Sequence, residues 1–184
     1  MDVLATIFLG FISSVFSAII LIYFVFWYWK PNIEISNHIS KSKENGIDLY
    51  KIKFINYSKY SANEVEVELW QKTEYKATSN SVGRNVKMEK LKLSTENWLS
   101  IDKFITNKSI SKIGLAPHCI TIKILAVDLQ QILNHKNHIS LSFKISVKHG
   151  LSNITKTFSR DYNDENCIKS GRFVFGNNLN IESI

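Results

Sequence analysis

The sequence predicts a mainly β protein, in which one amino-terminal transmembrane helix is followed by an antiparallel β-sandwich, or a barrel, with one short helix. Two observations predict this class. The run 3–29 contains no charged residue, and the rest of the chain alternates apolar with polar residues in several short segments. Only 7 Gly and 2 Pro occur in 184 residues, 45% of which are apolar, so collagen-like and disordered chains are excluded. We expect a helix over 3–29 and one domain over 30–184.

The run from Val3 to Trp29 is long enough to cross a bilayer, because about 20 helical residues span the hydrocarbon core. A cleaved signal peptide is disfavoured, since no Lys or Arg precedes the run and no small-residue cleavage site follows it. A buried helix of a soluble protein is also disfavoured, because the run continues for 27 residues without a polar face. The end of the run carries the residues predicted to lie at the membrane–water interface: Tyr23, Trp27, Tyr28, Trp29 and Lys30.

The charges on either side of the run predict its orientation. Only Asp2 precedes the run, whereas lysines follow it, beginning with Lys30, Lys41 and Lys43. The positive-inside rule then places the amino terminus outside and the domain in the cytoplasm, with the helix in the cell inner membrane. The two cysteines are too few for a disulfide scaffold and are compatible with a reducing compartment.

Small residues recur along the predicted helix. Gly10, Ser14 and Ala18 are spaced by four residues, and Ser13 and Ser17 lie beside them. A stripe of small residues lets two membrane helices approach closely. The stripe therefore favours a homo-oligomer held together by helix packing.

Period-two alternation predicts the strands of the domain. The clearest patterns predict strands at 50–54, 65–69, 120–124 and 139–147, and weaker patterns predict strands at 33–37, 85–93, 154–160 and 172–175. Asp128 is a good N-cap for a single helical turn that ends at Leu133. Short polar turns between the strands favour an antiparallel sandwich or barrel.

The domain is strongly basic. All 23 Lys and Arg residues of the chain lie in it, and the chain carries a formal net charge of +7. Such a domain is attracted to anionic lipid headgroups, to nucleic acid or to nucleotides. The candidate basic surface consists of Arg84, Lys87, Lys90 and Lys92.

No catalytic signature is found in the sequence. Phosphate-binding glycine loops and the G-x-S-x-G motif are absent. Three groups of potential metal ligands are each too isolated to predict a metal site. They are His135 with His138, His118 with Cys119, and an acidic turn. We therefore expect no enzyme, no cofactor, and no catalytic or metal-binding residues. The acidic turn contains Asp161, Asp164 and Glu165.

Two pairs of segments carry a resemblance to known proteins. The segments 50–58 and 62–69 are similar to consecutive strands of immunoglobulin-like domains, with the Asn-x-Ser turn at Asn56. Together with 147–150 and 171–176 they resemble uncharacterised bacterial single-span membrane proteins with a carboxyl-terminal β-sandwich. The tryptophan and disulfide of antibody domains have no counterpart here.

The layout also resembles small membrane effector and accessory proteins of anti-phage, CRISPR-associated systems. That resemblance implies a protein that assembles in the membrane and forms a pore. Its expected partners are the lipid bilayer, further copies of itself and a protein of the defence system. The Arg-His nuclease motif proposed for that group is missing from this chain, so the resemblance does not extend to RNA cleavage.

Three hypotheses of function remain open from the sequence. The first is an oligomerising effector that perturbs the membrane in anti-phage defence. The second is a membrane-tethered β-sandwich that recruits a protein partner. The third is a sensor of nucleotide or nucleic acid that uses the basic residues.

Overall fold

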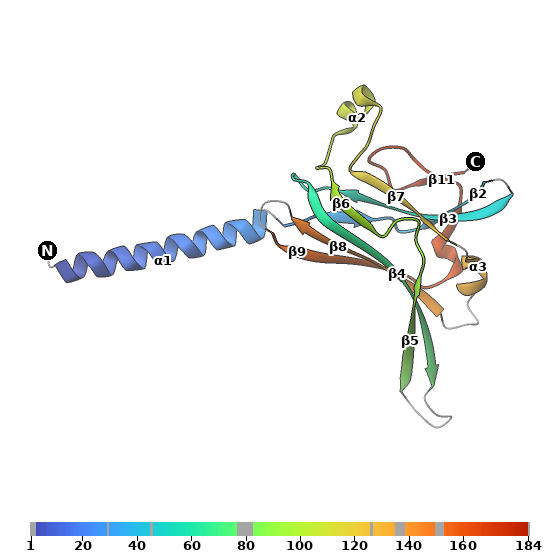
Figure 1. Cartoon of the computed structure of the whole chain (residues 1–184), viewed down its shortest axis with the longest axis horizontal. Helices are drawn as coiled ribbons and strands as arrows, with labels where there is room; N and C mark the ends of the chain where they lie inside the picture. Colours follow the sequence, from blue (N-terminus) through green and yellow to red (C-terminus); the bar gives the residue numbers. More distant parts are fainter. Residues whose placement is uncertain are drawn as a thin grey trace.

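The structure is a computed structural model, and it consists of an apolar helix followed by a mainly β domain (Figure 1). This arrangement confirms the predicted fold class. The residues that the structure describes are 3–28, 30–44, 46–76, 83–125, 127–134, 139–149 and 153–183.

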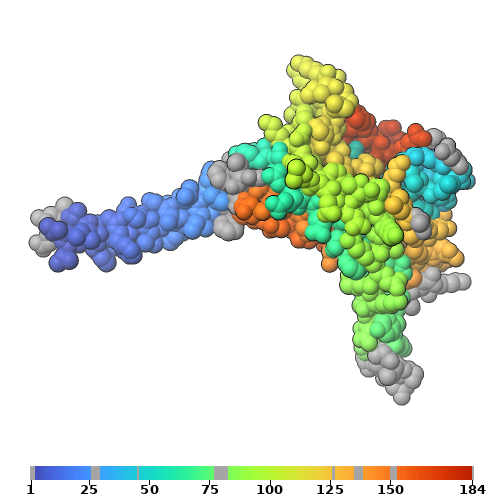
Figure 2. All heavy atoms as spheres, in the orientation of Figure 1, coloured from blue at the N-terminus to red at the C-terminus, as the bar shows by residue number. Residues whose placement is uncertain are grey.

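The amino-terminal helix α1 (Val3–Tyr28) is a single run of 26 residues that extends away from the domain (Figures 1 and 2). Its segment Val3–Val25 has a mean hydropathy of 2.4, and none of its most apolar window is buried against the rest of the protein. A helix that is apolar on all sides needs an apolar environment. By length and composition, α1 is able to span a membrane.

The first sheet is organised around β3 (Ile47–Asn56). The strands β1 (Ile33–Ile35) and β2 (Ile39–Glu44) pair with successive halves of one edge of β3, and β7 (Cys119–Ile124) pairs with the other edge. These pairings are antiparallel. The short strand β10 (Ile168–Ser170) then joins β2 in parallel, so one pairing of the sandwich departs from the antiparallel pattern.

The second sheet is organised around the long strand β4 (Ala62–Lys76). One edge of β4 pairs with β6 (Asn97–Ile101) and then with β5 (Arg84–Leu91). The other edge pairs with β8 (Ile139–His149), which in turn pairs with β9 (Thr155–Tyr162). All of these pairings are antiparallel, as expected from the alternating sequence.

The core lies between the two sheets. The inward faces of β3, β4 and β8 supply one continuous apolar cluster, which includes Phe54, Val67 and Phe143. Burying each such side chain stabilises the fold by about 1.5 to 3 kcal/mol relative to leaving it exposed. The hydroxyl of Tyr162 donates to the carbonyl oxygen of Ser36 at 2.8 Å and links the second sheet to the first.

Within the described part of the chain, two short α-helices and one 3-10 turn interrupt the strands. The predicted helical turn is α3 (Leu129–Ile132), and the Asp128 carboxylate caps it by accepting from the backbone N–H of Gln130 at 3.0 Å. The sequence did not predict α2 (Asn107–Ile113), because α2 buries only one side chain and so has no amphipathic repeat. The 3-10 turn is η2 (Glu165–Cys167).

The carboxyl-terminal segment lies against the first sheet. It contains β11 (Arg172–Phe173) and β12 (Ile181–Glu182), which pair with each other. The expected strand at 172–175 is therefore shorter than predicted. The strands β2, β6, β10 and β12 were not predicted at all, because they are short or carry few apolar residues.

Candidate functional site

The small-residue stripe is exposed on α1. Gly10, Ser13, Ser14, Ser17 and Ala18 all have exposed positions, and the Ser14 hydroxyl donates to the Gly10 carbonyl oxygen at 2.9 Å. A Cβ added at Gly10 would meet no atom within 4 Å. Packing within the chain therefore does not require this glycine, and the serine hydroxyl is satisfied within the helix. The stripe is available for packing against another helix.

The predicted interface residues follow at the end of α1. Tyr23 is exposed on the helix, and Lys30 is exposed directly after it. Trp27 and Tyr28 belong to the last turn of α1, but their side chains, and the whole of Trp29, lie outside what the structure describes. Strand β1 begins at Ile33, so only a short connection separates the helix from the first sheet.

The candidate basic surface is divided by the structure. Arg84 and Lys90 lie on one face of β5, whereas Lys87 lies on the opposite face and Lys92 follows the strand. Acidic residues also neutralise the surface. Arg84 pairs with Glu74 at 2.9 Å and Lys87 pairs with Glu89 at 2.6 Å.

Lys90 bridges two carboxylates, those of Glu96 at 3.0 Å and Glu68 at 3.4 Å. These contacts raise the pKa of Lys90, the hydrogen bond to Glu96 contributing most. A stretch in which most cations already have anionic partners makes a weak phosphate-binding surface.

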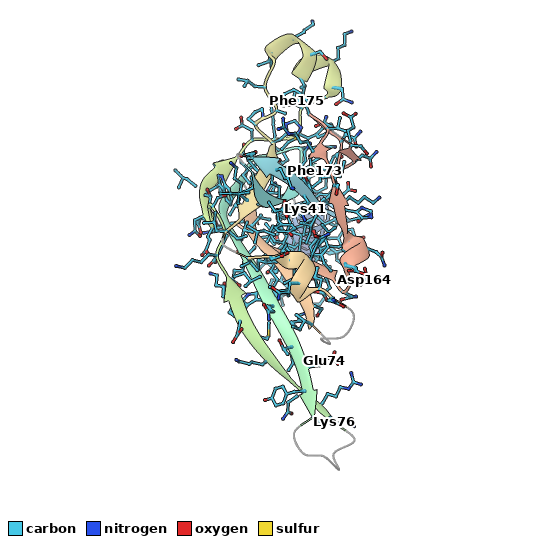
Figure 3. The ribbon with its side chains drawn as sticks, turned by 90° about the vertical axis from the view of Figure 1, so that its right-hand side faces the viewer. Lys41, Glu74, Lys76, Asp164, Phe173 and Phe175 are labelled. Carbon is cyan, nitrogen blue, oxygen red and sulfur yellow. The ribbon has the colours of Figure 1, made fainter. Side chains whose placement is uncertain are left out.

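The far halves of β4 and β5 form a hairpin. Its residues 71–73 still pair with β8, and its tip, 74–76 with 84–86, extends past the end of β8. We call this element the hairpin arm and define it as residues 71–76 and 84–90 (Figures 1 and 2). Figure 3 shows Glu74 and Lys76 far along the arm, away from the sandwich. Every residue of β5 before Leu91 is exposed, and residues 71–73 of β4 are half-buried, so the arm supplies no side chain to the buried core cluster. The sequence analysis assigned strands here but did not predict the protrusion.

One face of the arm combines apolar and charged side chains. Val86 and Met88 are 52% and 43% exposed and lie on the same face of β5. Cross-strand neighbours on this face are Glu74 opposite Val86 and Lys72 opposite Met88. Lys72 in turn pairs with Asp161 at 3.2 Å. An apolar centre with a charged rim is the usual composition of a protein-binding surface.

A second polar arrangement, centred on Lys53, holds the carboxyl-terminal segment against the first sheet, and we call it the clamp. The Lys53 side chain is only 3% exposed, and its ammonium donates to three carbonyl oxygens. The distances are 2.6 Å to Val174, 2.7 Å to Gly176 and 2.8 Å to Asn178. The alternation of the sequence places Lys53 on the outward face of β3, but the carboxyl-terminal segment covers that face.

Asn177 extends the same clamp to β7 and to the chain before α2. Its side-chain oxygen meets the Nε2 atom of His118 and accepts from the Cys119 thiol at 3.6 Å. Its amide nitrogen donates to the carbonyl oxygen of Ile105 at 2.6 Å. Asn177 thus ties three separate segments together.

The chemistry of the clamp is structural. Burial raises the pKa of the Cys119 thiol, with Lys53 opposing that shift, so the thiol stays protonated at neutral pH and is a poor nucleophile. Burial lowers the pKa of Lys53, whereas its carbonyl acceptors favour the charged ammonium. The clamp contains no nucleophile–base pair poised for catalysis.

No group of three or more His, Cys, Asp or Glu that could hold a metal ion occurs among the described residues. His135 and His138 lie outside that part of the chain. In the acidic turn, Asp161 pairs with Lys72, and Asp164 caps η2 by accepting from the Asn166 N–H at 2.9 Å. Glu165 is the first residue of η2.

No protein-family model matches the chain, and no curated protein matches it either.

Proposed function

We propose that this protein is a membrane-anchored β-sandwich that uses its hairpin arm to bind a protein partner. The observation that carries the proposal is the arm itself. Ordering a residue costs about 1 to 2 kcal/mol of backbone entropy, and a hairpin outside a core recovers little of it through burial. An ordered projection that does not stabilise the domain is best explained by contact with another molecule.

The chemistry of the arm favours a protein over a nucleic acid. Val86 and Met88 provide an apolar centre, and their charged neighbours occur as ion pairs of both signs. A nucleic acid would require an excess of unpaired cations on one face, which the arm does not have. The anchor confines the domain to the bilayer surface and raises the local concentration of membrane-bound partners.

Site-directed photo-crosslinking in cells tests this proposal. A photoreactive phenylalanine at Met88 should give a discrete adduct with a second protein. The matched control is the same substitution at Ile113, which is also exposed but lies on α2. Adding Val86→Asp should abolish the Met88 adduct. Equal adducts from both positions, or none from Met88, would reject the arm as the binding surface.

A second candidate function rests on the small-residue stripe of α1, which is exposed and has no packing role within the chain. In this alternative the helices self-associate, and the assembly perturbs the membrane, as the layout of anti-phage effectors implies. The only clearly polar side chains in the span are hydroxyls, which favour tight helix packing over a water-filled lumen. This argues for the tether as the better-supported function.

Self-association and membrane damage can be measured separately. Ser14→Leu should reduce the helix–helix association seen in a membrane reporter assay, whereas Phe16→Leu, on the opposite face of α1, should not. A voltage-sensitive dye then reports the potential of cells that express the full chain. If the full chain depolarises the cells and Ser14→Leu removes that effect, the effector hypothesis replaces the tether hypothesis. An unchanged membrane potential supports the tether hypothesis.

A further inference from the structure

A hollow lies at the end of the sandwich opposite α1, where Lys41 is visible in Figure 3. Its volume is about 450 Å³, which is within the range of small-molecule sites. Its walls come from β2, from the start of β3 and from the turn between β10 and β11. The residues that carry the argument are Lys41, Ser42, Lys43, Asp48, Gly171 and Arg172.

The hollow has an excess of positive charge. Lys41 pairs with Asp48 at 2.7 Å, and this contact raises the pKa of Lys41 and keeps it charged. Lys43 and Arg172 form no ion pair with any residue of the described chain. The lining of the hollow thus carries three cations and one carboxylate, and this excess of positive charge favours an anionic ligand.

Two polar atoms in the walls of the hollow are buried without a partner. Ser42 is 4% exposed, and its hydroxyl makes no hydrogen bond within the described chain. The Oδ1 atom of Asp48 is likewise buried and unbonded, although Oδ2 of the same carboxylate pairs with Lys41. Each unsatisfied buried group costs about 1 to 3 kcal/mol. Ser42 faces the opposite side of β2 from Lys43, whereas Asp48 lies across from Lys43 on the same face. The aspartate oxygen can therefore accept from a hydroxyl or an N–H of a ligand held by Lys43.

The walls are held in place by backbone contacts. The Ser40 hydroxyl donates to the Gly171 carbonyl oxygen at 2.6 Å, and the Gly171 N–H donates to the Lys41 carbonyl oxygen at 2.8 Å. Gly171 has a φ of 137°, and an added Cβ would overlap the backbone of Glu182. These contacts fix the turn that carries Arg172 beside β2, so the site exists before any ligand binds.

We propose that this hollow binds a phosphorylated small molecule that also bears hydroxyl groups, of the mononucleotide class. The phosphate lies against Lys43 and Arg172, and a ligand hydroxyl donates to Oδ1 of Asp48, which lies directly across from Lys43 on the same face of the sheet. The position of the hollow, away from α1, favours a free solute over a lipid headgroup. This site is separate from the hairpin arm, so the inference does not depend on the proposed function.

Calorimetric titration of the full chain in phosphatidylcholine nanodiscs tests the proposal with AMP, inorganic phosphate and adenosine as probes. AMP should bind, phosphate should bind more weakly, and adenosine should bind at least tenfold more weakly than AMP. Arg172→Gln and Lys43→Gln should each raise the Kd for AMP by about tenfold. The matched control is Arg160→Gln on β9, which should leave the Kd unchanged.

The possible outcomes separate the sources of the phosphate. Nanodiscs that contain phosphatidylglycerol test for a lipid headgroup in the hollow. If they suppress AMP binding to the parent chain, and if Arg172→Gln removes that suppression, a lipid headgroup occupies the hollow. The free-solute proposal is then overturned. The absence of AMP and phosphate binding at millimolar concentration also overturns it. So does an effect of Arg172→Gln no larger than that of Arg160→Gln. Thermal unfolding of each variant shows whether it remains folded.

Discussion

The side-chain nitrogen of Lys53 lies 2.7 Å from the carbonyl oxygen of Gly176, which is 123 residues further along the chain. This contact is the centre of the clamp that holds the carboxyl-terminal segment on the outer face of β3. Because an ammonium has three donors and no acceptor, three converging carbonyl oxygens satisfy it completely. The clamp closes one side of the sandwich without adding to the apolar core.

Lys53→Met should destabilise the protein. The substitution leaves the three carbonyl oxygens without their donor, and the free energy of unfolding should fall by about 1 to 3 kcal/mol. Urea unfolding of the full chain in detergent measures this, and Lys103→Met, at an exposed position, is the control. Hydrogen exchange should also accelerate around 174–178. Equal stability of the two variants would show that the clamp contributes nothing.

Tyr162→Phe should change the response of stability to alkaline pH. Burial raises the pKa of Tyr162, so above about pH 10 the unfolded chain loses this proton while the folded chain retains it. The contribution of Tyr162 is fully present below that pH and declines above it, by up to about 1.4 kcal/mol per pH unit.

The phenylalanine variant should lose this decline and, at neutral pH, about 1 kcal/mol for the hydrogen bond to Ser36. Unfolding free energies measured between about pH 8 and pH 11 provide the test. Tyr75→Phe, on the exposed hairpin arm, is the control. An alkaline slope that Tyr162→Phe leaves unchanged would contradict the assignment.

Gly171→Ala should destabilise the carboxyl-terminal segment. An added Cβ would sit 2.8 Å from the carbonyl carbon of Glu182, and the φ of 137° is unfavourable for alanine. We expect a loss of about 1 to 3 kcal/mol in unfolding free energy. Gly83→Ala is the matched control, because a Cβ there meets no atom within 4 Å. The prediction fails if the two alanine variants unfold at the same urea concentration.

Leu99→Cys reports the orientation of the domain. Leu99 is 89% exposed on β6, so a cysteine there should react readily with a membrane-impermeant maleimide. If the domain is cytoplasmic, as the lysines after α1 predict, labelling beyond that of the parent chain should appear only after the cells are permeabilised. Labelling of intact cells at the same rate would reverse the predicted topology.

The elements that the sequence predicted well are those whose signal is local. The apolar run predicted α1 because it is long and carries no polar face. The strict alternation of apolar and polar residues predicted β3, β4, β7 and β8. The polar strand β2 and the short strand β6 were missed because pairing with a neighbour, and not their own pattern, stabilises them. The helix α2 was missed because it buries only Ile110.

The candidate sites show the same division. The residue types of the stripe and of the interface could be read directly, since both lie within one helix. The basic surface could not be judged from sequence, because Glu68 and Glu96, which neutralise Lys90, lie on segments outside β5. Nor did any local pattern distinguish the buried Lys53 from the other lysines of the alternating strand.

The sequence by itself determined that the protein has an apolar helix able to span a membrane and a β-rich domain, because both follow from the composition and period of contiguous residues. Only the tertiary structure decided that Lys53 is enclosed, that β4 and β5 continue beyond the core as an arm, and that Lys43 and Arg172 share a hollow. The enclosure of Lys53 and the shared hollow each join segments distant in the chain, and the arm is defined by where the pairing of β4 with β8 stops. Their juxtaposition depends on how the strands pair and pack, which no single segment encodes.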